Sequence, residues 1–407
     1  MKMSAVMAKT AVFRSEDADI VAEGDAKSLN RTAISLVRTL AGMREIETEW
    51  RKLEDESGEA CLFQSFDWCV NFALHAKGRE QDDFRIFTLR RNGKLKAVLP
   101  LAIRLNQGIK VLTGMTEPFQ QYTDMLVAGG ENPETVFRTM LPALKNAGAD
   151  YLHLGQVRKS SPLGRAVSGS LKPSGEVDGA PYVQLSDWPD FETYFQSVKA
   201  KTRKNMRNAR NRLERDAPVT HLVARGGSVL TEVIDRSFEG REAWLERQGL
   251  TSRAFRDSGF AGFVSRFKDP ELTGIETVAF SLQHGDKPIA DQWGFIHKGR
   301  YYAFIAGWDQ AYEESSPGKL HLGNIIEACY EAGLKTADFM IPAARYKFTW
   351  ANDATPVCDY VMPLTLRGRI HNTLWLNLIR PLAKQVAYAM PAGLRSLLFR
   401  IVMPSKE

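Results

Sequence analysis

The same succession of elements is predicted twice along this chain, and this repeat constrains the fold more than any single motif. The first half has strands on either side of Asn92–Gly93, then a helix over 133–146 and an apolar strand over 151–154. The second half has three strands, a helix and a returning strand, over 276–283, 288–297, 300–308, 317–332 and 336–341. We therefore predict an α/β (α+β) fold of two tandem units, each a mixed and mostly antiparallel sheet flanked by helices.

The length of 407 residues also favours two domains, because a single hydrophobic core rarely grows to that size. Ser160–Pro181 is rich in Gly, Pro and Ser, and we interpret it as a loop or a domain boundary. The predicted domains are residues 31–182 and 183–368. Residues 1–30 are interpreted as a disordered leader. Residues 369–407 are interpreted as a basic amphipathic tail that either contacts a membrane surface or packs on the protein itself.

Composition narrows the class of protein further. No apolar run of 18 residues occurs, so no membrane-spanning helix is predicted, and we expect a cytoplasmic protein with at most peripheral membrane contact. The four cysteines include no C-x-x-C pair and have no histidine at ligand spacing. This pattern predicts neither a structural zinc site nor a disulfide framework.

A strand meets a helix at Ser316–Pro317–Gly318–Lys319–Leu320, and this junction has the composition of a phosphate-binding site. Ser316 is placed to cap the helix with its side chain, and Pro317 has the φ that the first helical position needs. Gly318 lets a ligand approach the backbone, where free N–H groups and the helix dipole attract anions. The alternative is an ordinary helix start that binds nothing.

An ordered set of short motifs along the chain resembles one group of acyltransferases. The motifs are Phe63–Gln64–Ser65 with Trp68, Gln292–Trp293, Trp308–Asp309, Ser316–Pro317–Gly318, Asp338–Phe339, Tyr346–Lys347 and Trp350. In this order they are similar to GNAT-superfamily acyltransferases of the CelD and BioF-like acetyltransferase family, which is related to the Fem tandem-GNAT peptidyltransferases. Relatives usually have a glycine-rich, acidic turn where this chain has residues 340–345, and often a lysine near the position of Ile305.

The resemblance implies acyl-CoA (acetyl-CoA) as a co-substrate, with no metal. The donor would lie where the strand over 300–308 separates from its neighbour. Its pyrophosphate would lie on the amides of Gly318, Lys319 and Leu320, and the Lys319 side chain would add a charge-assisted contact.

Acyl transfer from a thioester needs a group that takes a proton and gains from a group that gives one. Tyr346 is the candidate acid for the departing thiolate, and Asp309 is the candidate base. The structural alternatives are a Tyr346 packed on the core with its hydroxyl in water, and an Asp309 that makes a local hydrogen bond in a turn.

The candidate residues for acceptor binding are Gln292, Trp293, Lys347 and Trp68. Because side chains alternate along a strand, Gln292 and Trp293 face opposite sides, so one can line a pocket while the other packs on a helix. We interpret Trp293 as a core residue, as aromatic side chains in strands usually are. Lys347 either binds the acceptor or a phosphate, or is an ordinary solvated lysine.

A basic run between Lys199 and Arg215 follows the predicted boundary. Its cations are Lys199, Lys201, Arg203, Lys204, Arg207, Arg210, Arg212 and Arg215, against the single acid Glu214. The run either binds an anionic acceptor or tRNA, or is the solvated face of a helix that begins near Asp190. No aromatic residues interleave the charges, so stacking on single-stranded nucleic acid is not predicted.

These features together predict an enzyme that transfers an acyl group from acyl-CoA to an amine or hydroxyl. The acceptor would be a small molecule or a glycan- or lipid-linked precursor, and the resemblance points to exopolysaccharide, cellulose or cell-envelope biosynthesis. Two alternatives stay open: a Fem-like transferase that uses aminoacyl-tRNA, the only case in which nucleic acid would be a partner, and a non-catalytic scaffold of a polysaccharide synthesis system.

Overall fold

The computed structural model describes residues 32–75, 83–106 and 108–373. Its first half contains β1 (Thr32–Val37), α1 (Leu40–Glu45), α2 (Glu47–Glu56), η1 (Leu62–Gln64), α3 (Phe66–His75), β2 (Asp83–Arg91), β3 (Lys94–Asn106), β4 (Ile109–Gly114), β5 (Leu126–Val127), α4 (Pro133–Lys145), β6 (Tyr151–Arg158) and α5 (Pro162–Ser168). The predicted hairpin is confirmed, because Asn92 and Gly93 join β2 to β3 with φ values of 52° and 77°.

Strand β7 (Pro173–Gln184) leads from the first half into the second, which begins with η2 (Leu185–Asp187), α6 (Phe191–Ser197), α7 (Ala200–Leu213), β8 (Val219–Ala224), α8 (Gly227–Arg247), α9 (Phe260–Ser265), η3 (Arg266–Lys268) and α10 (Pro270–Thr273). The second half continues through β9 (Thr277–His284), β10 (Lys287–His297), β11 (Arg300–Trp308), η4 (Gln310–Ser315), α11 (Pro317–Glu331), β12 (Thr336–Asp338), η5 (Lys347–Thr349), β13 (Asp353–Pro363) and α12 (Leu366–His371). The predicted antiparallel meander is confirmed as β9, β10 and β11.

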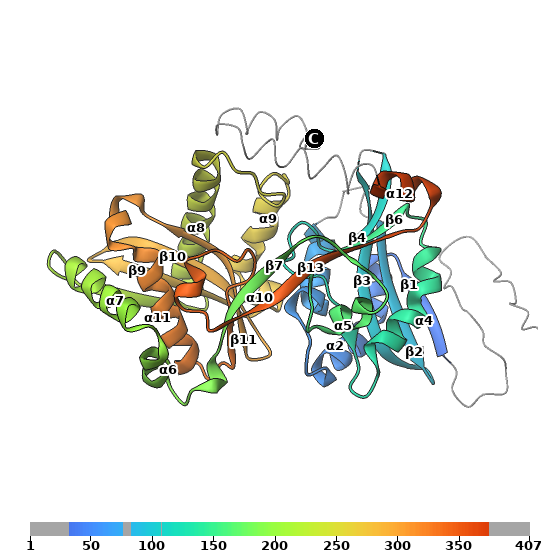
Figure 1. Ribbon diagram of the computed structural model, residues 1–407, viewed down its shortest axis with the longest axis horizontal. Coiled ribbons are helices and arrows are strands. Elements are labelled where there is room, and N and C mark those ends of the chain that lie inside the picture. Colours follow the sequence, from blue (N-terminus) through green and yellow to red (C-terminus); the bar gives the residue numbers. More distant parts are fainter. Residues whose placement is uncertain (1–31, 76–82, 107, 374–407) are drawn as a thin grey trace, which may run out of the picture.

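One mixed sheet of 13 strands runs through both halves. Its order is β1-β2-β3-β4-β6-β13-β7-β12-β11-β10-β9-β8, with β5 beside β3. Helices flank this sheet, so the predicted α/β class is confirmed (Figure 1).

The two halves exchange strands at the middle of the sheet, where β7 and β13 cross between them (Figure 1). Strand β13, from the second half, pairs with β6 of the first half on one side and with β7 on the other. Strand β7 pairs in turn with β12 of the second half. The interpretation of Ser160–Pro181 as a loop is wrong, because it forms α5 and most of β7, and the predicted division after residue 182 falls inside β7.

A buried aromatic cluster also joins the halves. Trp68 of α3 has no exposed surface and stacks on Phe267 of the second half, with ring centroids 5.6 Å apart. Its ring also meets Phe263 and Phe295 edge-on, at 5.3 and 5.4 Å. The indole N–H donates to the Thr116 hydroxyl at 2.9 Å, so the one polar atom of this side chain is paired inside the core.

The helix expected from Asp190 through the basic run is two helices, so the single-helix prediction is wrong. α6 ends at Ser197, Val198 is extended, and α7 begins at Ala200. The Arg203 guanidinium donates to the Val198 carbonyl at 2.5 Å and thereby satisfies a backbone group that the break exposes. The break turns Lys199 towards the start of α11, where it lines a cleft described below.

Two predicted segments lie outside the described residues: the leader 1–30, and most of the tail, of which residues up to 373 are described. Within the described part of the chain, no helix has the length and apolar content needed to cross a bilayer.

Replacement of Trp68 by alanine tests the junction between the halves. Trp68→Ala should lower the free energy of unfolding by about 3–5 kcal/mol, because it leaves a cavity among rings from both halves. Urea denaturation followed by circular dichroism measures this loss. A loss below about 1 kcal/mol would show that the cluster contributes little to the junction.

Candidate functional site

Two parallel strands separate near the centre of the second half. Strands β11 and β12 pair from Arg300 with Thr336 to Tyr302 with Asp338, and there β12 ends. Strand β11 continues to Trp308, so its last six residues have lost their neighbour on that side. The predicted strand over 336–341 is therefore shorter than expected, because Met340 takes a left-handed φ of 54° and turns the chain away. The two strands therefore diverge beyond Asp338, and the region between them is called the gap.

Asp338 is the last residue of β12 and lies where the two strands begin to diverge. Its buried carboxylate accepts hydrogen bonds from the Tyr122 hydroxyl at 3.1 Å, from the Arg300 guanidinium at 3.2 Å and from the Met340 amide at 2.8 Å. Tyr122 belongs to the first half, so a group from each half fixes the end of β12. The Asp338 carboxylate is 2% exposed, and hydrogen bonds to a buried charged group are strong. These bonds therefore fix the turn at Met340.

Lys347 completes the support of that turn from inside. Its side chain is 6% exposed, and its ammonium group donates to the carbonyls of Met340 at 2.8 Å and Pro342 at 3.0 Å. Burial lowers the pKa of Lys347 to about 8, against the opposing attraction of Asp338. The ammonium group of Lys347 therefore faces backbone carbonyls and not solvent. Neither the acceptor-binding interpretation nor the solvated one describes this position.

The start of α11 has the predicted Pro317 at its first position, but the predicted side-chain cap is wrong. Ser316 adopts a left-handed conformation, with φ 48° and ψ 52°, and its hydroxyl makes no capping bond. The cause is the preceding 3-10 turn, which Ser316 closes by donating its amide to the Glu313 carbonyl at 2.9 Å. The amides of Lys319 and Leu320 donate to the Ser316 carbonyl at 3.0 and 3.3 Å, so of the three predicted amides only that of Gly318 has no bonding partner among the described residues.

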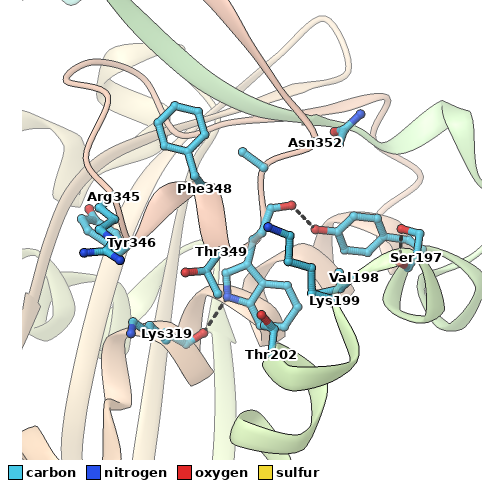
Figure 2. Close-up of a pocket in the computed structure, with 13 residues that line it drawn as sticks. Ser197, Val198, Lys199, Thr202, Lys319, Arg345, Tyr346, Phe348, Thr349 and Asn352 are labelled. Carbon is cyan, nitrogen blue, oxygen red and sulfur yellow. Dashed lines mark hydrogen bonds between the residues drawn. The ribbon is translucent and has the colours of Figure 1, made fainter.

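Two adjoining clefts flank this helix start. The larger, of about 760 Å³, lies between the α6–α7 break and the segment around η5 (Figure 2). The smaller, of about 330 Å³, lies between α7 and the turn before α11. Lys319, Thr202 and Thr349 line both clefts, so the two are one continuous depression. Its cations are Lys199, Lys319 and Arg345 in the larger part and Arg212 in the smaller, where Asn205 and Asn208 add amide groups.

Tyr346 lies at the edge of this depression, beside Arg345 and Phe348 (Figure 2). Nearly half of the residue, 47%, is exposed, and Tyr346 contributes to the lining of the larger cleft. The crowded surroundings of its hydroxyl raise its pKa, and the nearby charge of Arg241 opposes that rise. The phenol is therefore protonated throughout the neutral range, as a proton donor requires.

Asp309 occupies the end of β11 and is engaged in structural contacts. Its carboxylate forms an ion pair with Lys287 at 2.8 Å and accepts from the Ala311 amide at 2.9 Å, at the start of η4. The hydrogen bond from Lys287, followed by that from Ala311, lowers the pKa of Asp309. A carboxylate held in this way is a weak base, and the arrangement is that of the turn residue which the sequence left as the alternative.

The remaining predicted residues lie away from the clefts. Gln292 is buried on the α11 side of the sheet and donates to the Tyr301 hydroxyl at 3.1 Å. Trp293 packs on the opposite side among Phe267, Phe295 and Phe304, and Trp68 belongs to the same cluster. The Leu320 side chain is in the core, so only its backbone faces the helix start.

Other residues of the site had no recognisable signal in the sequence. Thr202 and Asn205 reach the depression because α7 packs on η4, where the Arg212 guanidinium donates to the Glu314 carbonyl at 3.2 Å. Tyr122 reaches Asp338 across 216 positions of sequence. The basic run over 199–215 indicated a helix whose charges either bind anions or are solvated, but it did not indicate which of its side chains face the cleft.

Comparison with known proteins bears on the fold. Residues 200–348 match the family model of the acetyltransferase (GNAT) domain. A crystal structure of FemX superposes with a TM-score of 0.55 at 10% sequence identity, covering 81% of this chain and 98% of that one. A tandem GNAT protein from the clavulanic acid biosynthesis pathway gives 0.48 at 11% identity, covering 82% and 99%. No curated protein matches the sequence.

The family match and the FemX superposition describe the fold as GNAT-like, as the sequence motifs predicted. The GNAT match covers the strands that separate, the helix start and both Tyr346 and Lys347. Within the described residues, no group of three or more His, Cys, Asp or Glu side chains is placed to hold a metal ion.

The buried Lys347 makes a testable contribution to the pH dependence of stability. Its pKa is about 8 in the folded protein and about 10.4 in an unfolded chain, so between these values the unfolded state binds more protons. The difference in unfolding free energy between the natural protein and Lys347→Met should therefore grow with pH, by up to about 1.4 kcal/mol per unit between about pH 8 and 10. Urea titrations at several pH values measure it, and a difference that stays constant would contradict the buried ammonium.

Proposed function

We propose that the protein is an acyltransferase that takes its acyl group from acyl-CoA. The observation that carries this proposal is the cationic depression at the start of α11, the helix that follows the free end of β11 through η4. The phosphates would lie at these cations, and the extended thioester arm would run along the free end of β11, which pairs with β12 no further than Tyr302. The GNAT match over residues 200–348 supports the same assignment.

The residues of the depression fit the anionic end of CoA. The pyrophosphate would lie at the amide of Gly318 with the side chains of Lys319 and Arg212, where the helix dipole adds to the charges. The third phosphate would lie in the larger part, near Lys199 and Arg345. Phe348, exposed over 48% of its surface, offers a face for the adenine ring.

The chemistry proposed at the gap is nucleophilic attack of an amine or hydroxyl on the thioester carbonyl. The new bond to the acceptor forms as the carbon–sulfur bond breaks, and Tyr346 gives its proton to the leaving sulfur. Because its pKa is lowered, Asp309 is a weak base. The simplest nucleophile is therefore an amine that is already neutral when it binds. The family resemblance suggests a small-molecule, glycan-linked or lipid-linked acceptor of envelope or exopolysaccharide biosynthesis.

The exposed face of α7 favours a second candidate, transfer from aminoacyl-tRNA. Lys201, Lys204 and Arg207 are exposed, and among the described residues no acid pairs with them. A tRNA donor predicts binding that weakens steeply with salt, with a logarithmic slope of about −0.9 for each phosphate contacted in a duplex. Filter binding of tRNA at several salt concentrations distinguishes this donor from CoA.

Substitution of Gly318 tests the CoA site with a matched control. A methyl group at Gly318 would lie 3.7 Å from Trp308 Cδ1, which is an ordinary contact, so Gly318→Ala should retain the rise in melting temperature that CoA causes. Gly318→Glu adds a carboxylate beside the pyrophosphate and should abolish that rise, which corresponds to roughly 2.7 kcal/mol at a hundredfold excess over the dissociation constant. Equal CoA responses in the two variants would place the phosphates elsewhere.

The role of Tyr346 predicts a change in rate without a change in donor binding. Tyr346→Phe should lower kcat about 100-fold or more, because the thiolate must then leave without a positioned proton. Release of free CoA thiol, followed with a thiol reagent against a panel of amines, measures the rate. The CoA melting shift of the variant should equal that of the natural protein. An unchanged kcat would remove Tyr346 from the reaction.

A further inference from the structure

The two flanking helices of the second half cover opposite faces of the sheet. Leu230, Val233 and Ile234 of α8 pack in one core cluster with Trp293 and Phe295 of β10. Ile325 and Ile326 of α11 pack in another cluster with Phe280 and Tyr301. The cationic depression lies at the start of α11 and so belongs to the α11 face.

Arg241 lies where α8 touches the free end of β11. A methyl group at Gly240 would lie 3.8 Å from the Cα of Gly307, so the helix and the strand are in backbone contact there. Gly307 belongs to the part of β11 that has already separated from β12. A methyl group at Gly307 would lie 3.4 Å from the Cα of Ser237, and Arg241 is one turn after Ser237, so it belongs to the helix face that meets the free end of β11. The charge of Arg241 also influences the pKa of Tyr346 and of Lys347.

The guanidinium of Arg241 is partly buried without a counter-charge. It stacks on Trp244, 4.4 Å from the ring centroid, and within the described ranges neither a carboxylate nor a carbonyl bonds to it. Burial lowers its pKa, which is the mark of a cation that has lost water and gained no anion.

Arg236, about one and a half turns earlier on the same helix, is an arginine that is paired with acids and serves as a comparison. Its guanidinium bonds to the Asp291 carboxylate at 2.7 and 3.2 Å and to Glu232 at 3.3 Å. The hydrogen bond with Asp291 raises the pKa of Arg236. Two arginines on one helix, both partly buried, therefore differ in that one has two acids and the other has none.

We propose that Arg241 binds an anionic group, a carboxylate or a phosphate, of the acceptor, next to the amine or hydroxyl that receives the acyl group. A planar guanidinium stacked on an indole offers two parallel N–H donors to such an oxyanion. The bound anion would then be the counter-charge of Arg241, which pairs with no acid among the described residues. The donor phosphates have their own cations on the α11 face. The inference rests on the acyltransferase proposal and names the class of its acceptor.

The test uses inorganic phosphate and acetate as probes of the two oxyanion types. The melting temperature of the full chain is measured with excess CoA, at constant ionic strength, as each anion replaces chloride. Arg241→Gln is compared with the natural protein and with Lys94→Gln, which removes an exposed charge from the β2–β3 turn. One anion or both should stabilise the natural protein and Lys94→Gln, with binding at least about tenfold weaker in Arg241→Gln.

A response to phosphate alone indicates a phosphorylated acceptor, and a response to acetate alone indicates a carboxylate. Without ligands, Arg241→Gln should melt at most slightly lower than the natural protein, because it loses the stacking on Trp244 but no hydrogen bond or ion pair among the described residues. Equal anion responses in the natural protein and Arg241→Gln, including none in either, would overturn the proposal. Failure of the acyltransferase proposal gives a different result, the absence of any CoA shift, and the comparison of anions can then be read in the protein alone.

Discussion

The exchange of β7 and β13 between the halves is the constraint on which the site depends. Strand β12 has only three residues, and it is held on one side by β11 and on the other by β7. Because Asp338 pairs with Tyr182 of β7 as well as with Tyr302 of β11, the end of β12 is fixed by a strand that leads out of the first half. Beyond Asp338 the chain stays with this exchanged strand, since the Phe339 amide donates to the Pro181 carbonyl at 2.9 Å, and the turn at Met340 then takes it away from β11.

Burial of charge divides the residues around the gap into two kinds. Asp338 and Lys347 are almost fully buried, and each makes at least two hydrogen bonds that hold the turn at Met340. A buried ion with its bonds satisfied rigidifies its surroundings. Arg241 is partly buried and has no acid paired with it among the described residues, and Tyr346 is 47% exposed although burial around its hydroxyl raises its pKa. The charges that fix the turn at Met340 are therefore paired within the fold, and the Arg241 guanidinium has only the Trp244 ring as its partner among the described residues.

Local patterns predicted local structure well. The Asn92–Gly93 turn, the meander of β9 to β11 and the helix from Pro317 each depend on neighbours within a few residues, and each was found. The strand exchange could not be predicted, because β13 pairs with β6, a strand far away in the sequence. Nothing in the local pattern of β13 distinguishes β6 from other strands as its neighbour. Asp309 shows the same limit at the site, since its partner Lys287 lies on a neighbouring strand and nothing in the Trp308–Asp309 motif indicates the ion pair.

Hydrogen–deuterium exchange with and without CoA tests most directly whether the donor occupies the gap between β11 and β12. The account predicts slower exchange with CoA in two segments, residues 303–309 at the free end of β11 and residues 315–320 at the start of α11. The exchanged strands β7 and β13, already paired on both sides, should not change. Protection confined to α7, or spread over the first half with none at 315–320, would contradict the account.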